Sequence, residues 1–170
     1  MSDAEDFKYL WSRREALRLR ALTNRLYQQD RWRILERREG LVKAASLIAG
    51  SVALTRVVDP GVVNGCIAVI FAGTAASLVF GWGQKARDAA KRASEWTALE
   101  RDMEQKGERG FTEADLNTWA ARANDVEAGE PAMNSVLFER AYQRACKSLG
   151  ATPESEAGWW DRNGRPILIP

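Results

Sequence analysis

The stretch GVVNGCIAVIFAGTAASLVFGWG, residues 61–83, decides how this chain folds. It contains no charged side chain, and Asn64 is its only strongly polar residue. About 20 apolar residues, each rising about 1.5 Å along a helix, span the roughly 30 Å hydrocarbon core of a bilayer. The stretch therefore predicts a helix that crosses a membrane.

The stretch before it, residues 41–58, is also apolar and is interrupted only by Lys43 and Arg56 near its ends. Asp59-Pro60-Gly61 separates the two as a turn, because proline cannot continue the first helix. The pair predicts a helical hairpin across a membrane. The alternative is a buried core helix in a soluble protein, but such helices usually run shorter, and glycine-rich helices are poor in water.

Charge is distributed unevenly along the chain, although 25 Lys and Arg against 23 Asp and Glu leave a net charge of only +2. Arginine is abundant before Gly40, and Lys85, Arg87, Lys91 and Arg92 follow the second apolar stretch directly. By the positive-inside rule, both termini face the cytoplasm and the tip of the hairpin faces out.

The composition argues against an enzyme. The chain has no histidine, which is the commonest general base and the commonest metal ligand. Cys66 and Cys146 have no neighbouring cysteine in a CxxC arrangement, and no P-loop, dinucleotide fingerprint or paired-carboxylate site is present. We therefore expect no catalytic residue, no metal and no cofactor.

The remaining sequence predicts an all-α chain. Residues 1–40 form a charged helix, residues 41–83 the two-helix hairpin, residues 84–150 a cytoplasmic helical region, and residues 151–170 an irregular tail. Ala86, Ala89, Ala93, Trp96 and Met103 form an apolar stripe that continues the second span as a stem, with Glu100 out of register. Thr112 is an expected helix N-cap, and a further helix covers about residues 134–148.

Small residues recur every four positions in the second span, which favours helix association in lipid. We infer that one face packs on the first span and another on a neighbouring subunit, giving a homo-oligomer for which four subunits is the expectation. Both faces packing within one monomer is the alternative. The candidate pore and packing residues are Asn64, Gly65, Gly73, Thr74, Ser77 and Gly81.

Two cationic segments could bind an anionic ligand. One is the amino-terminal helix, with Arg13, Arg14 and Arg18, and the other is the tail, with Trp159, Trp160, Arg162 and Arg165. Alternative readings are a solvated or lipid-headgroup-binding face for the helix, and tryptophans that anchor the tail to the helical region.

The order of elements resembles the SLATT family of two-transmembrane effectors. The resemblance covers about the first hundred residues: a charged helix ending Arg37-Arg38-Glu39-Gly40, the hairpin over residues 41–82, and the charged helix that begins Gln84-Lys85-Ala86-Arg87. The resemblance implies a bacterial inner-membrane, pore-forming or channel-like effector of anti-phage defence. It also implies a nucleotide or oligonucleotide signal from an associated nucleotidyltransferase. A membrane-anchored helical interaction scaffold without a pore is the alternative.

Overall fold

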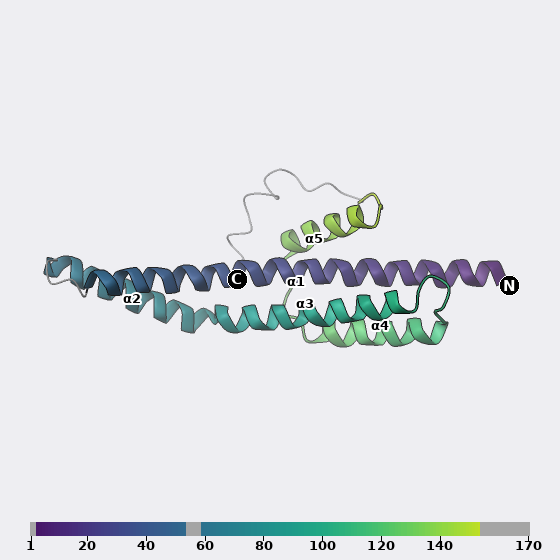
Figure 1. Cartoon of the computed structure of the whole chain (residues 1–170), viewed down its shortest axis with the longest axis horizontal. Helices are drawn as coiled ribbons and strands as arrows, with labels where there is room; N and C mark the ends of the chain where they lie inside the picture. The colour runs from purple at the N-terminus through teal and green to yellow at the C-terminus, as the bar shows by residue number, and fades with distance from the viewer. Residues whose placement is uncertain (1–2, 54–58, 154–170) are drawn as a thin grey trace. The chain divides into compact units, whose positions relative to one another are not determined.

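The computed structural model describes residues 3–53 and 59–153, with side chains for residues 5–52 and 59–153, and the secondary structure of these ranges is all-α (Figure 1). The helices are α1 (Asp3–Ala53), α2 (Pro60–Phe80), α3 (Trp82–Gln105), α4 (Glu113–Ala128) and α5 (Ser135–Ser148). No strand occurs in the described ranges, which confirms the predicted fold class at this level.

The chain divides into two units. Among the described residues, the helical unit contains 3–30 and 90–153, and the apolar unit contains 31–53 and 59–89. Helices α1 and α3 each contribute residues to both units.

Helix α1 runs through Gly40 without a break, so the expected junction there does not interrupt the helix. A glycine inside a helix costs about 1 kcal/mol relative to alanine, which a helix of 51 residues tolerates. The charged and apolar parts of residues 3–53 therefore belong to one element.

The prediction that the second span continues into the next helix is wrong, because α2 ends at Phe80 and Gly81 is its C-cap. Gly81 has φ +59°, in the left-handed region that favours glycine, and its N–H donates to the Ser77 carbonyl. Helix α3 begins at the next residue, and the Lys85 N–H donates to the Gly81 carbonyl. Glycine at this position lets the chain change direction between two helices without a loop.

The core of the helical unit lies among α1, α3 and α4. Ala21, Trp96, Leu99 and Leu116 are fully buried in it, and Met103 is almost so. The expected stripe on α3 is confirmed as a buried face. Leu99, adjacent to the mismatched Glu100, fills the position that keeps the stripe continuous.

Local capping fixes where the last two helices begin. The Thr112 hydroxyl accepts from the Asp115 N–H at 3.2 Å, and the Asp115 carboxylate accepts from the Thr112 N–H at 2.9 Å, which confirms Thr112 as an N-cap. Asn134 caps α5 by accepting from the Leu137 N–H at 3.0 Å.

Helix α5 is held against α1 within the helical unit. The Tyr27 ring meets Phe138 edge-on with centroids 5.9 Å apart, and the Tyr27 hydroxyl accepts from the Asn134 N–H at 3.1 Å. Arg144 forms an ion pair of 2.7 Å with Asp30. These contacts place the start of α5 beside the middle of the described amino-terminal helix.

Candidate functional site

Helix α2 presents an apolar surface that the described protein does not cover. Its 21 residues include no buried side chain. Phe71, Leu78 and Val79 are each more than 70% exposed. Within residues 3–53 and 59–153, α2 is the one helix that is long and apolar enough to cross a membrane.

The first expected span has a different form. Residues 41–53 are the end of α1 rather than a separate helix, and Leu41, Leu47 and Ile48 lie exposed on it. Residues 54–58, including Arg56, lie outside the described part of the chain.

Helix α2 packs against the end of α1 through one face. Val63, Cys66, Ile70, Gly73 and Ser77 are half-buried and recur at intervals of three and four. Figure 1 shows the two helices side by side in this region. A Cβ placed on Gly73 would lie 3.2 Å from Val42 Cγ1 and 3.6 Å from Ser46 Oγ, so the absence of a side chain permits this approach.

The structure divides the expected ladder of small residues between two faces. Residues four apart on a helix are offset by about 40°, so a ladder of several steps winds around the helix. Gly73 and Ser77 lie on the face toward α1, whereas Gly65 is exposed and a Cβ added to it meets no atom within 4 Å. Ala68 and Ala72 are exposed on the same side as Gly65.

The polar candidates of α2 do not form one line. Asn64 and Thr74 are both exposed. Ten residues separate them, which places them about 80° apart around the helix axis. Ser77 is half-buried on the α1 side, and Gly81 serves as the cap that ends α2.

The three candidate arginines of α1 point to different surroundings. Arg13 donates to Asn117 at 3.1 Å and lies 3.7 Å from the Glu113 carboxylate. Arg14 is buried, donates to the Met103 carbonyl at 3.4 Å and lies over the Trp11 ring at 5.3 Å. The structure therefore separates Arg13 from Arg14.

A cavity of about 250 Å³ brings Arg14 and Arg18 together with Arg25, which the sequence reading did not select. Glu100 and Glu104 also line it, so three guanidinium groups face two carboxylates. Arg14 Nε is buried and has no hydrogen-bond partner among the described residues. Burial raises the pKa of Glu100 above its ordinary value, although Arg25 donates to its carboxylate at 2.9 Å.

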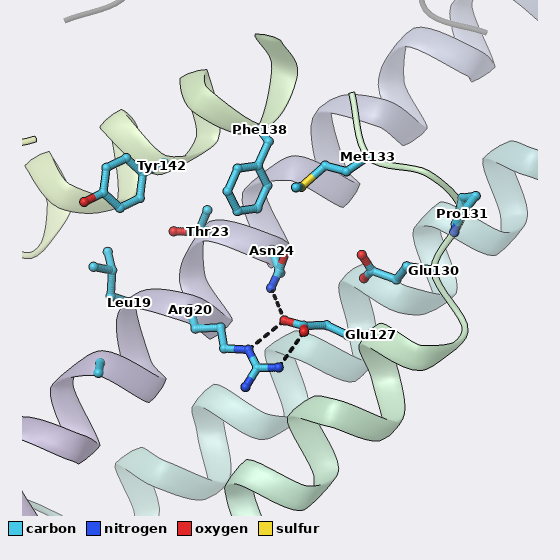
Figure 2. Close-up of a pocket in the computed structure, with 11 residues that line it drawn as sticks. Leu19, Arg20, Thr23, Asn24, Glu127, Glu130, Pro131, Met133, Phe138 and Tyr142 are labelled. Atoms are coloured by element: carbon cyan, nitrogen blue, oxygen red, sulfur yellow. Dashed lines mark hydrogen bonds and ion pairs between the residues drawn. The ribbon is translucent and has the colours of Figure 1, made fainter. Parts of the chain in front are cut away.

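A larger cavity of about 610 Å³ also lies in the helical unit and was missed by the sequence reading (Figure 2). Thr23 and Asn24 of α1 line it, and both are buried. The sequence does contain a signal for this cavity: Thr23 and Asn24 lie between the apolar residues Leu22 and Leu26. Polar side chains on a buried helix face need hydrogen-bond partners, which indicates a polar site beside them.

The second predicted ligand segment, with Trp159, Trp160, Arg162 and Arg165, lies outside the described residues. Within residues 3–53 and 59–153, no group of three His, Cys, Asp or Glu side chains is placed to hold a metal ion. Comparison with protein-family models, with curated proteins and with solved structures found no match to this chain.

Proposed function

We propose that this protein is an integral membrane protein whose apolar unit inserts as a helical hairpin and self-associates. The proposal depends on one observation: α2 is 21 residues long, apolar and without a buried residue. An apolar helix that served as the core of a soluble protein would be covered by its neighbours. Here the bilayer is the environment that covers it.

The contact between α1 and α2 supports a hairpin rather than a lone span. Gly73 lies against Val42 and Ser46, and the close approach of two helices through glycine is typical of packing in lipid. Lys43 pairs with Glu39 at 2.6 Å, so the charged groups nearest the apolar end of α1 partly neutralise each other.

The exposed small residues of α2 support self-association. Gly65, Ala68 and Ala72 lie on the side away from α1, where a Cβ at position 65 meets no atom. A second copy could approach closely there. We propose a homo-oligomer, with four subunits as the working stoichiometry, in the bacterial inner membrane with both termini in the cytoplasm.

The activity we propose is that of a pore-forming or channel-like effector, as the SLATT resemblance implies, controlled by the cytoplasmic helical unit. A nucleotide or oligonucleotide signal would act on that unit. The cavity lined by Arg14, Arg18 and Arg25 supports this part, because guanidinium groups bind phosphate through paired hydrogen bonds. A phosphate there competes with Glu100 for Arg25 and with Glu15 for Arg14.

A membrane-anchored scaffold without a pore is the second candidate, and the positions of Asn64 and Thr74 favour it. A conducting helix presents its polar groups toward one water-filled line, whereas these two lie about 80° apart around α2. No charged residue occurs between Pro60 and Phe80 to form a selective ring.

Membrane depolarisation measured with a voltage-sensitive dye separates the two candidates. Cells would express the chain alone and together with the associated nucleotidyltransferase. The pore proposal expects depolarisation in one condition, and its reduction by Gly65→Leu but not by Phe71→Ala. Stable membrane localisation without depolarisation in either condition would overturn the pore and leave the scaffold.

A further inference from the structure

The larger cavity of the helical unit has the size and lining of a small-molecule site. Its volume of about 610 Å³ falls within the range of about 300–1,000 Å³ that is usual for ligand pockets. Figure 2 shows Leu19, Phe138 and Tyr142 from α1 and α5 along one side, and Glu127, Glu130 and Pro131 along the other. The lining thus combines apolar side chains with the carboxylates of Glu127 and Glu130.

The one guanidinium group that residues 3–53 and 59–153 contribute to the lining is engaged by a carboxylate. Arg20 donates to both oxygens of Glu127, at 2.7 and 2.5 Å, and also to Asn124 at 2.8 Å. Asn24 donates to Glu127 at 3.0 Å, which gives that carboxylate three hydrogen bonds (Figure 2). These bonds occupy three of the five N–H donors of Arg20, and the Glu127 carboxylate offsets its charge.

Glu130 is the acidic group of the lining that can still accept hydrogen bonds from a ligand. Its Oε1 accepts one hydrogen bond, from the Trp96 indole N–H at 3.2 Å. A carboxylate has about four acceptor sites on its two oxygens. Among the residues that the structure describes, two carboxylates and one guanidinium line the cavity, so this lining carries one net negative charge and favours a cation.

Thr23 supplies a second polar group. Its side chain is on the cavity wall, the residue is 2% exposed, and its hydroxyl has no hydrogen-bond partner among the described residues. Threonine inside a helix commonly bonds to the carbonyl one turn earlier, and this hydroxyl does not. A buried hydroxyl without a partner costs free energy unless a ligand or water satisfies it.

We propose that this cavity binds a small aromatic amine that carries a second polar group. The ammonium group donates to Glu130, and the aromatic body lies against Leu19, Phe138 and Tyr142. The second group bonds to the Thr23 hydroxyl after a change of the χ1 rotamer turns its buried oxygen toward the cavity. The proposal does not depend on membrane insertion or on a pore.

Methyl NMR on the full chain in phosphatidylcholine nanodiscs tests this site directly. The chain has three methionines, Met1, Met103 and Met133. Met133 lines the cavity, whereas Met103 is buried in the core and lies outside it. Tyramine is the probe, with phenethylamine as the analogue without a hydroxyl and 3-(4-hydroxyphenyl)propionate as the anionic analogue.

We expect tyramine to shift the Met133 methyl signal saturably while the Met103 signal stays in place. The anionic analogue should bind at least about tenfold more weakly, the factor expected for one charge-assisted hydrogen bond. Glu130→Gln should remove that preference, and Glu113→Gln, an exposed acidic residue of α4 outside the cavity, should not. Thr23→Val should weaken tyramine more than phenethylamine.

Each other result overturns the proposal. Absence of a saturable Met133 shift with all three probes would show that the cavity binds no ligand of this class. Equal affinity for the cation and the anion, or a preference that survives Glu130→Gln, would refute the assignment of a cation. An unchanged Met103 signal in Glu130→Gln and in Thr23→Val shows that the core of the variant is intact. If one of the two variants fails to fold, the ligand affinities of the other decide the test.

Discussion

Leucine substitutions at two glycines of α2 test two different contacts. Gly73→Leu tests the packing of α2 on α1 within one copy, and Gly65→Leu tests the contact between copies. Gly73 faces Val42, and a Cβ there would lie 3.2 Å from Val42 Cγ1, already tighter than ordinary contact. A leucine side chain adds three carbons beyond that Cβ. Overpacking of this kind costs about 1–3 kcal/mol. The population in which α1 and α2 separate should therefore rise about 5–150-fold.

Gly73→Ala is the control for the expected cost of overpacking by leucine. Its Cβ requires Val42 to move by a few tenths of an ångström, and removing a glycine from a helix interior gains about 0.5–1 kcal/mol. The two effects oppose each other, so Gly73→Ala should change pairing little. Gly65→Leu places its side chain in open space within one copy and should leave the pair intact.

Distances between spin labels at positions 41 and 78, both exposed, measure the pairing in nanodiscs. Dilution with unlabelled protein restricts the signal to one copy. We expect one distance in the parent and in Gly65→Leu, and a second, longer population in Gly73→Leu. Gly65→Leu should instead reduce the oligomer seen by cross-linking. An unchanged distance in Gly73→Leu, or a separated pair in Gly65→Leu, would refute the reasoning.

Three further predictions concern the helical unit. Leu116→Ala removes a fully buried side chain and should lower the free energy of unfolding by about 2–5 kcal/mol, measured by urea titration. Thr112→Ala should raise the pKa of Asp115, which hydrogen bonds from Thr112 hold below its ordinary value, as carboxyl NMR would show. With these hydrogen bonds intact, ionised Asp115 stabilises α4 at pH values above the unfolded-state pKa of about 3.9. This stabilisation is lost as pH falls through the lower pKa of the folded state. Burial raises the pKa of Glu100. Its contribution to the free energy of unfolding is therefore fully present below the ordinary glutamate pKa near 4.5 and is lost as pH rises through the pKa of the folded state. Glu100→Gln should flatten that dependence in unfolding curves.

The sequence predicts the features of this fold that depend on neighbours along the chain. The Thr112 cap needs only a hydroxyl and an acidic residue three positions later, and both are visible in the sequence. The buried stripe of α3 follows from apolar residues at helical spacing. Gly81 shows the limit, because a glycine permits a left-handed conformation without requiring it.

The cavities depend on contacts between distant segments, which periodicity does not reveal. Arg20 and Glu127 are 107 residues apart, and Tyr27 and Asn134 are equally distant. Charge counting marked Arg14 and Arg18 but gave no reason to select Arg25, which reaches the same cavity from two turns further along α1. The caps and the buried stripe, which depend on neighbouring residues, could therefore be predicted from the sequence, whereas the cavities, which depend on residues far apart in the chain, could not.

Solvent accessibility at the middle of α2 tests the central proposal most directly. A spin label would be placed at Phe71→Cys, or for comparison at Arg101→Cys on an exposed position of α3, in a chain with Cys66 and Cys146 replaced by alanine. In bilayers, membrane insertion predicts that oxygen relaxes the label at position 71 more than a water-soluble nickel chelate does, with the reverse at position 101. A label at position 71 that the nickel chelate relaxes as strongly as the label at position 101 would contradict the account.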